Sequence, residues 1–350
     1  MRDVAVVGFA QRQMREMSGS PTCVELLVPI FAELFEQTGW TKSDIGFWCS
    51  GSSDYLAGRS FSFVSAVDAI GALPPVIESH VEMDAAWALY EAWVKIQTGE
   101  VDTALVFGFG KASAGTLRRV LALQLDPYVL APLWPDSVSI AAMQARLGIE
   151  SGVWDEKKMA SVVTRSRASA VDNPYAVVSG TTDEADLLSE PMYADPLRKH
   201  DCAPVSDGAA AIILAADDHA RSVVDRPAWI TGIQHRVDSQ GLGLRDLTRS
   251  PSTGLAAGAL DLSGVDLAEL HAPFSHQELI LRAELGLADD VTLNPSGGAL
   301  CGNPMFASGL VRIGEAANRV IAGASDTAIS HATSGPALQQ NLLCLMEGRT

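Results

Sequence analysis

The segment from Leu293 to Pro304, LNPSGGALCGNP, says more about the fold than any other part of the sequence. Its paired glycines, Gly297 and Gly298, follow a predicted strand, and glycine lets the backbone come close to a ligand. We predict a glycine-rich turn over residues 294–304 that leads into a helix over 305–321, whose first N–H groups face that ligand. Ser296, Gly297 and Gly298 are therefore candidate binding residues. A tight turn that simply needs two glycines is the alternative interpretation.

Two further polar segments come at predicted strand ends. Residues 269–276 read ELHAPFSH and close a predicted strand over 265–270, and residues 331–336 read HATSGP and lie between the last two predicted strands. Histidine is the side chain that titrates near neutral pH without help from its surroundings. These segments add the candidate site residues His271, His276, His331, Ser334 and Gly335.

Strand and helix patterns alternate on both sides of an irregular middle. The middle, residues 112–200, holds several prolines, and we expect a mostly helical insert there. Two α/β runs with crossover connections predict a duplicated α/β fold, divided into an N-terminal half (1–111), the loop insert (112–200) and a C-terminal half (201–350). The predicted strands cover 4–7, 45–49, 103–107, 208–215, 229–235, 265–270, 327–331 and 342–346, and the predicted helices cover 24–37, 84–97, 275–285 and 305–321.

The composition argues against several classes of protein. The 350 residues include 25 Lys and Arg and 42 Asp and Glu, and the formal charge of −17 disfavours nucleic acid and anionic membranes as partners.

No apolar run approaches the roughly 18 residues of a membrane span, and Met1 leads directly into a predicted strand, so we expect a cytoplasmic protein without a signal peptide. The five cysteines form no CxxC pair, which disfavours a metal site or a disulfide framework. Residues 108–113, GFGKAS, match only half of a dinucleotide fingerprint, so no nicotinamide cofactor is expected.

The three polar segments, in this order and at this spacing, resemble motifs of the thiolase superfamily, in particular of its sterol-carrier-protein thiolase and lipid-transfer-protein branch. That branch carries an H-D-x-F loop, an N-x-S-G-G…G-H-P loop and a C-terminal glycine loop. Residues 201–210, DCAPVSDGAA, also resemble the segment that re-enters its second half. The resemblance covers essentially the whole chain and points to the shorter actinobacterial type encoded with steroid-degradation enzymes. It implies a five-layered thiolase fold of two βαβαββ-type halves, and a coenzyme A thioester as substrate with no covalently bound cofactor.

The sequence departs from this family at the catalytic positions. Thiolases hold a nucleophilic cysteine where a strand enters the first buried helix. That place is Glu82 here if the comparison is anchored on the helix and Ala85 if it is anchored on the strand. Asn303 stands in place of the histidine of G-H-P. It can donate a hydrogen bond to an enolate oxygen but cannot shuttle protons. His271 matches the histidine of H-D-x-F, which in the family helps to hold the thioester oxygen or its water, and Ala272 replaces the acid of that loop.

These departures disfavour a mechanism with a covalent acyl-cysteine and favour one that passes through an enolate of the CoA thioester. An oxyanion hole and one base suffice for retro-aldol cleavage of a β-hydroxyacyl-CoA, because the base takes the hydroxyl proton while the hole holds the developing enolate. The candidate bases are His271, His276, Glu82 and Asp84. For His276 the alternative is a surface residue at a helix start, and for the two acids it is a helix cap. Aldolases of the branch use tyrosines in the C-terminal loops, but all five tyrosines here precede residue 200.

Two other functions stay open. The chain can be a non-catalytic or half-catalytic subunit that pairs with a second thiolase-like chain, or with a small partner that combines an OB-fold with a zinc ribbon. It can instead be a thiolase with a displaced nucleophile such as Cys301 or Cys344, although a packed thiol is the simpler interpretation of Cys301. In each case the resemblance implies a homodimer or heteromer formed through the sheet edge of the first half, and an acyl-CoA ligand that is steroid-derived in the branch it resembles.

The insert adds two further sets of candidates. Lys111, Arg118 and Arg119 lie near its start and are predicted to contact the CoA phosphates. Trp134 and Trp154 can form a partner or lipid surface, with core packing as the default for large aromatic residues.

Overall fold

The computed structural model describes residues 2–14, 21–57, 60–71 and 76–349, and its strands form two blocks of the same design. The first block comprises β1 (Val4–Met14), β2 (Phe47–Gly51), β3 (Glu78–Val81), β4 (Thr103–Lys111) and β7 (Val205–Ala216). The second comprises β8 (Ala228–Val237), β9 (Leu267–Leu270), β10 (Thr292–Leu293), β12 (Thr327–Ser334) and β13 (Gln340–Gly348). The order is β1-β7-β4-β2-β3 in the first block and β8-β13-β12-β9-β10 in the second.

The two blocks also share their strand directions. In the first, β7 is antiparallel to β1 and β4, while β2 is parallel to β3 and β4. In the second, β13 is antiparallel to β8 and β12, while β9 is parallel to β10 and β12. A short antiparallel contact between β1 and β8 joins the blocks into one mixed sheet. The repeated order and directions confirm the predicted duplicated α/β fold.

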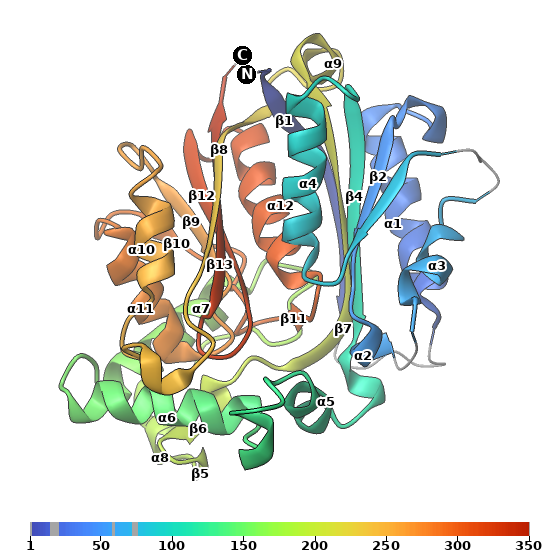
Figure 1. The fold of residues 1–350 in the computed structure, drawn as a ribbon. Helices are drawn as coiled ribbons and strands as arrows, with labels where there is room; N and C mark the ends of the chain where they lie inside the picture. Colours follow the sequence, from blue (N-terminus) through green and yellow to red (C-terminus); the bar gives the residue numbers. More distant parts are fainter. Residues whose placement is uncertain (1, 15–20, 58–59, 72–75, 350) are drawn as a thin grey trace.

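Two helices lie between the blocks, α4 (Ala85–Gln97) and α12 (Ser308–Ile321) (Figure 1). The outer faces are covered by α1 (Cys23–Thr38) and α3 (Ser62–Val67) on the first block and by α10 (Pro251–Ala257) and α11 (Ser275–Leu285) on the second, which gives five layers. Every residue of α12 from Ser308 to Ala317 is buried, so the helix needs small side chains where strands approach it. A Cβ at Gly314, for example, would stand 2.1 Å from the ring of Phe9.

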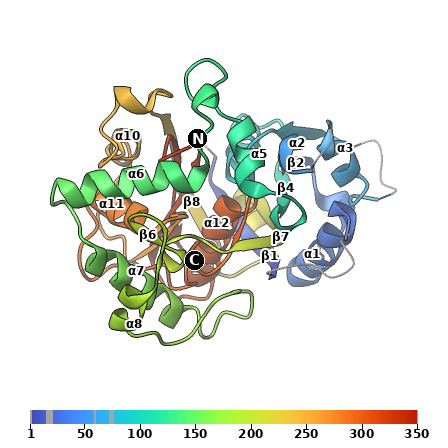
Figure 2. The ribbon, with the colours of Figure 1, turned by 90° about the horizontal axis from the view of Figure 1, so that it is seen from below.

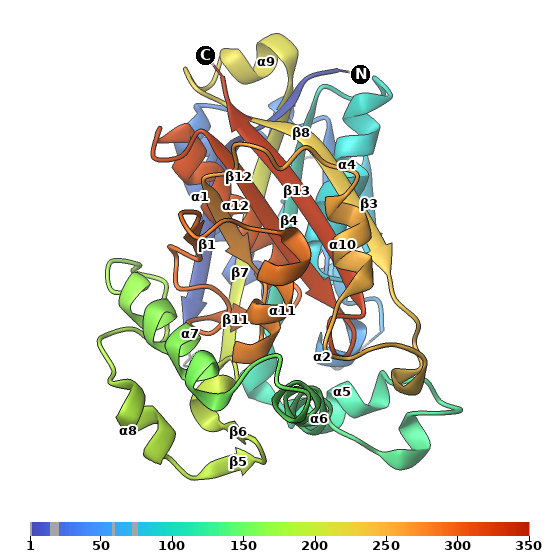
Figure 3. The ribbon, with the colours of Figure 1, turned by 90° about the vertical axis from the view of Figure 1, so that its left-hand side faces the viewer.

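The insert lies across one end of the two blocks (Figures 2 and 3). It is mostly helical, as predicted, and one of its two candidate tryptophans belongs to the core. Trp154 is buried and donates from Nε1 to the carbonyl of Ala145, whereas Trp134 is 53% exposed. Its elements are α5 (Leu117–Leu123), α6 (Ser137–Glu150), α7 (Glu156–Ser169), α8 (Glu184–Ser189), β5 (Met192–Ala194) and β6 (Leu197–Arg198). Two short helices lie outside it, α2 (Asp54–Ala57) and α9 (Asp217–Arg221).

Two boundaries differ from the predicted ones. β7 belongs to the first block and β8 is the first strand of the second. The chain therefore passes from one block to the other between Ala216 and Ala228, later than the division predicted at residue 201. The helix predicted from residue 305 begins at Ser308, because Asn303 and Pro304 form β11, a two-residue strand that pairs with the start of β7. No helix in the described ranges is long and apolar enough to cross a membrane.

Candidate functional site

One buried carboxylate caps both central helices. Asp84 precedes α4 and accepts a hydrogen bond from the backbone N–H of Ala86 at 2.9 Å. It also accepts N–H groups from Gly309 at 2.9 Å and Leu310 at 3.2 Å, in the first turn of α12, a helix that has no side-chain cap of its own. Burial raises the pKa of Asp84, and the three N–H groups oppose this rise. Asp84 therefore joins two helix starts, in line with the cap interpretation, and is not free to act as a base.

Replacing Asp84 with alanine should lower the free energy of unfolding by about 2–4 kcal/mol, because two helix starts lose their common acceptor and its charge. Urea unfolding followed by far-UV circular dichroism measures the loss. Asp84→Asn keeps one acceptor oxygen and should be clearly less destabilised. Equal stability of the parent and the alanine variant would contradict the capping role.

His271 and Asn303 form the centre of the candidate site. His271 directly follows β9, and its Nε2 lies 3.0 Å from Oδ1 of Asn303 in β11. The backbone N–H of Thr333 in β12 donates to Nδ1 of His271 at 3.3 Å. The backbone N–H of His271 donates in turn to the carbonyl of His331 at 3.2 Å. The three polar segments singled out in the sequence therefore meet at one place.

These contacts fix the tautomer of His271. Because an N–H group occupies Nδ1, that nitrogen is the acceptor and Nε2 carries the proton. Nε2 therefore donates to Oδ1 of Asn303, so the amide oxygen of Asn303 faces His271 and its Nδ2 faces away. Burial lowers the pKa of His271 to about 3, with a further contribution from His331, so the ring is neutral at physiological pH.

Asn303 is half-buried, whereas His271 is buried. The backbone N–H of Asn303 donates to Oγ of Ser206 at 2.8 Å, which holds the residue in place. Within the described part of the chain, no hydrogen bond uses its amide nitrogen Nδ2. A fixed N–H donor is suited to stabilise a thioester or enolate oxygen.

The glycine-rich turn is held by buried hydrogen bonds to neighbouring elements. Ser296 donates its N–H and hydroxyl to Glu269 at 2.9 and 2.8 Å, and Arg312 of α12 donates to Glu269 at 2.9 Å and to Oγ of Ser296 at 2.6 Å. Gly297 and Gly298 have φ angles of 95° and 65°, which L-residues rarely adopt. The tight-turn interpretation thus accounts for all three residues of the turn, and a contact between them and CoA stays a prediction.

Glu269→Ala should lower the free energy of unfolding by about 3–5 kcal/mol, because it leaves Arg312 as an unpaired buried charge. Arg312 is 2% exposed and Glu269 is 0% exposed, so water does not replace the lost partner. Thermal and urea unfolding measure the effect. Glu269→Leu combined with Arg312→Met removes both charges and should recover part of the loss. A double variant less stable than the single one would overturn this account.

Two predicted histidines are buried within the protein. His276 in α11 lies 3.1 Å from Oε1 of Gln144 in α6 through its Nε2, and burial lowers its pKa to about 3. The surface-residue interpretation of His276 is therefore wrong, because α6 of the insert covers it. His331 lies 2.9 Å from Oδ1 of Asn341 through its Nε2, and burial lowers its pKa to about 4. Ser334 and Gly335 follow at the end of β12.

Glu82 lies in the turn between β3 and α4, and its side chain is 48% exposed. One carboxylate oxygen accepts the N–H of Asp54 at 2.7 Å, and the other lies 3.5 Å from Nε2 of His80. Nδ1 of His80 is 3.1 Å from Oγ of Ser50. The sequence interpretation missed His80, although alternate residues of a strand share one face and Glu82 follows His80 by two positions.

The candidate thiols are packed residues. Burial raises the pKa of Cys301 and of Cys344 to about 12, so neither is a thiolate at neutral pH. The backbone carbonyl of Cys301 accepts the N–H groups of Val177 and Val178, which ties the insert to the glycine-rich turn. These surroundings disfavour a displaced nucleophile at either cysteine.

The basic residues predicted for the CoA phosphates lie at the start of the insert. Arg118 forms an ion pair with Asp136 at 2.6 Å, and Nζ of Lys111 donates to the carbonyl of Pro21 at 2.7 Å. Arg119 is exposed. Their contact with CoA stays a prediction.

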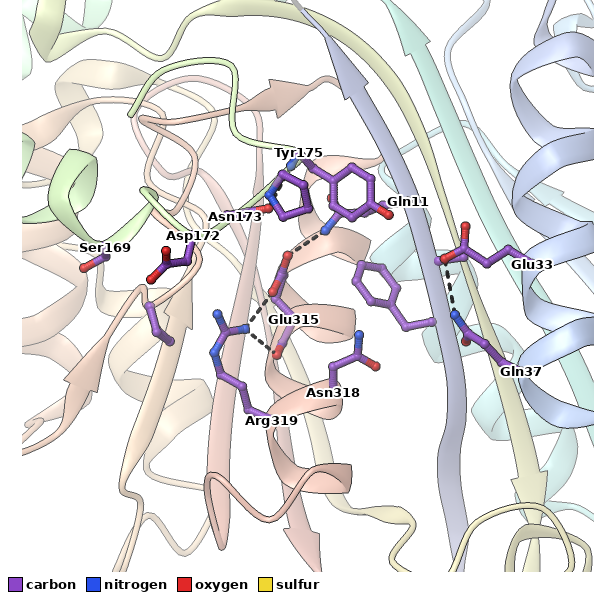
Figure 4. A pocket seen from close by; sticks show the side chains of 14 residues that line it. Gln11, Glu33, Gln37, Ser169, Asp172, Asn173, Tyr175, Glu315, Asn318 and Arg319 are labelled. Atoms are coloured by element: carbon purple, nitrogen blue, oxygen red, sulfur yellow. Dashed lines mark hydrogen bonds and ion pairs between the residues drawn. The ribbon is translucent and has the colours of Figure 1, made fainter. Parts of the chain in front are cut away.

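A polar pocket of about 300 Å³ opens between β1, α1, α12 and the segment that follows α7 (Figure 4). Its inner groups satisfy one another, since Gln11 donates to Glu315 at 2.6 Å and Arg319 donates to the same carboxylate at 2.6 Å. Neither His271 nor Asn303 lines it. The His271–Asn303 pair and this pocket are therefore separate features of the structure.

Comparison with known proteins finds similarity over nearly the whole chain. No family model matches it. The acetyl-CoA acetyltransferase of Methanothermobacter thermautotrophicus is 26% identical, over 93% of this chain and 94% of that protein. The solved structure titled Ltp2-ChsH2(DUF35) aldolase superposes with a TM-score of 0.80 over 99% of this chain and 98% of that chain, at 19% identity. The chain is similar to the thiolase superfamily over nearly its whole length.

A second thiolase-superfamily relative, human sterol carrier protein 2, is 24% identical over 70% of this chain and 53% of that protein. In the present thiolase-fold chain, the two positions that the sequence resemblance gives for the nucleophile hold no thiol. One is Glu82, in the exposed turn, and the other is Ala85, buried at the start of α4.

Proposed function

We propose that this thiolase-superfamily chain cleaves the Cα–Cβ bond of a β-hydroxyacyl-CoA by a retro-aldol reaction, without a covalent acyl-enzyme. The observation that carries the proposal is the fixed amide of Asn303, whose Oδ1 is held 3.0 Å from Nε2 of His271. The amide nitrogen is thereby turned outwards as a donor for an oxyanion. The absence of a thiol at Glu82 and Ala85 favours enolate chemistry over acyl transfer.

The proposed reaction needs one donor and one base. Asn303 binds the thioester oxygen through Nδ2, and Glu82 takes the proton of the β-hydroxyl. The Cα–Cβ bond then breaks, its electron pair forms the enolate of the acyl-CoA, and the β-carbon leaves as the carbonyl of a ketone or aldehyde. Glu82 returns the proton to Cα, which yields the shortened acyl-CoA and restores the carboxylate.

His271 has a positioning role in this scheme. Both of its ring nitrogens are engaged, one by Asn303 and one by the N–H of Thr333, and its pKa is far below neutral. A ring in this state has no free lone pair with which to take a proton. It instead determines which end of the Asn303 amide faces the substrate.

The relatives support the substrate class and suggest partners. Two are named for acetyl-CoA transfer and sterol carriage, and the solved neighbour is titled an aldolase made of two kinds of chain. For the present chain we propose a CoA thioester, steroid-derived in its acyl part, and a separate partner with an OB-fold and a zinc ribbon. We also propose a dimer or a heteromer with another thiolase-like chain, formed through β3, which is the edge strand of the first block in the described sheet.

The test incubates the purified chain with a steroid β-hydroxyacyl-CoA and with a short aliphatic one, alone and with a partner protein of the OB-fold and zinc-ribbon type. Mass spectrometry should detect a ketone or aldehyde and the shortened acyl-CoA in equal amounts. Glu82→Gln should abolish release while binding persists, and Glu36→Gln, an exposed acid on α1, is the matched control. Binding without release in every combination would reject the lyase and favour a subunit that presents CoA esters.

A further inference from the structure

Phe306 holds a backbone conformation that bulky residues rarely adopt. Its φ is 67°, in the left-handed region where glycine is favoured. Such a conformation persists only where the surrounding structure imposes it, and it gathers at ligand-binding and catalytic sites. Phe306 lies three residues after Asn303, in the segment that connects β11 to α12.

The backbone around Phe306 is pressed against the first block. The carbonyl of Phe306 accepts the N–H of Ala85 at 2.9 Å, at the start of α4. The carbonyls of Met305 and Phe306 lie so close to β4 that a Cβ at Gly110 would stand 2.1 Å from the first and a Cβ at Gly108 2.6 Å from the second. These contacts fix the segment and explain why its backbone cannot relax.

The side chains of this segment are not used for core packing. Met305 and Phe306 are both half-buried, and neither belongs to a hydrophobic cluster among the described residues. Two large apolar side chains therefore remain partly open to solvent in the segment that also carries the Asn303 donor. An aromatic ring and a flexible thioether are suited to contact an apolar group of variable shape.

We propose that Phe306, supported by Met305, is the specificity-determining residue of the site and contacts a bulky apolar group on the β-carbon of the acyl-CoA. The inference rests on the proposed function, because it takes Asn303 as the point where the thioester oxygen binds. Glycine would fit the backbone conformation at position 306 better than phenylalanine does. In this proposal phenylalanine is present because its ring contacts the substrate. Acyl-CoAs without a β-substituent miss this contact.

The test measures dissociation constants by isothermal titration calorimetry with two unreactive probes, cyclohexylacetyl-CoA, whose ring begins at the β-carbon, and acetyl-CoA. The parent protein should prefer the ring-bearing probe. Phe306→Gly should weaken its binding about tenfold and leave acetyl-CoA unchanged. Phe306→Leu should lie between the two. Phe306→Gly should melt at or above the temperature of the parent, because glycine suits the positive φ.

Phe61→Gly is the matched control, because Phe61 has a φ of 57°, is 69% exposed and precedes α3 on the outer face of the first block. It should change neither dissociation constant. Equal preference for both probes in the parent and in Phe306→Gly, with β-hydroxyacyl-CoA still cleaved, would overturn the role of Phe306 and leave the proposed function standing. Failure of the parent to bind either probe would overturn both.

Discussion

Asn303→Ala is expected to lower kcat for cleavage of a β-hydroxyacyl-CoA by about 10²–10³-fold, the usual effect of removing one oxyanion-hole donor. The donor matters most once negative charge develops on the thioester oxygen, so KM should change much less than kcat. Asn303 is half-buried and its side chain makes one hydrogen bond to His271. The melting temperature should therefore fall by only a few degrees.

The measurement is steady-state kinetics with product detection by mass spectrometry. His271→Ala should reduce kcat less than Asn303→Ala, because the donor is kept but its orientation is lost. Ser206→Ala removes the acceptor of the Asn303 backbone N–H but keeps the side-chain donor, so it should also reduce kcat less than Asn303→Ala. A loss of activity in His271→Ala that exceeds the loss in Asn303→Ala would show that His271 does more than position the amide.

Acidification from pH 7 to pH 5 is expected to lower the free energy of unfolding by about 5 kcal/mol through three buried histidines alone. Burial lowers the pKa of His271 and His276 to about 3 and that of His331 to about 4, against 6.5 for the exposed ring. Below pH 6.5 the unfolded chain binds protons that the folded chain does not. The stability that these neutral rings contribute is complete above pH 6.5 and is lost as the pH falls from there towards 3–4.

Urea unfolding at a series of pH values measures this dependence. His276→Gln removes one of the three titrating groups and should reduce the slope between pH 6 and pH 5 by about one third. His219→Gln is the control, because His219 is exposed on α9. A slope that stays the same in His276→Gln would mean that His276 is already protonated in the folded protein.

Sequence patterns predicted those parts of the fold that local periodicity encodes. The helix over 275–285 has the predicted bounds in α11, and α1 extends one residue beyond the prediction at each end. The predicted strand over 4–7 instead continues to Met14, through polar residues that do not alternate with apolar ones. Gln11 is buried there because it donates to Glu315 of α12, a contact between residues far apart in the sequence.

The sequence supplied candidate site residues but not the contacts between them. His271, Asn303 and His331 were chosen from three separate segments, and the structure brings these segments together. The sequence did not reveal that His271 orients Asn303, because this depends on the N–H of Thr333 at its other ring nitrogen. His80 was missed because β3 is a four-residue strand, too short for a clear periodic signal.

The cap provided by Asp84 has a consequence for the two halves of this duplicated architecture. The second half starts its central helix with Ala307 at the capping position and depends on a carboxylate encoded in the first half. A second half on its own would therefore start its central helix without this acceptor. The two repeats are alike in strand order, but a carboxylate of the first stabilises the central helix of the second.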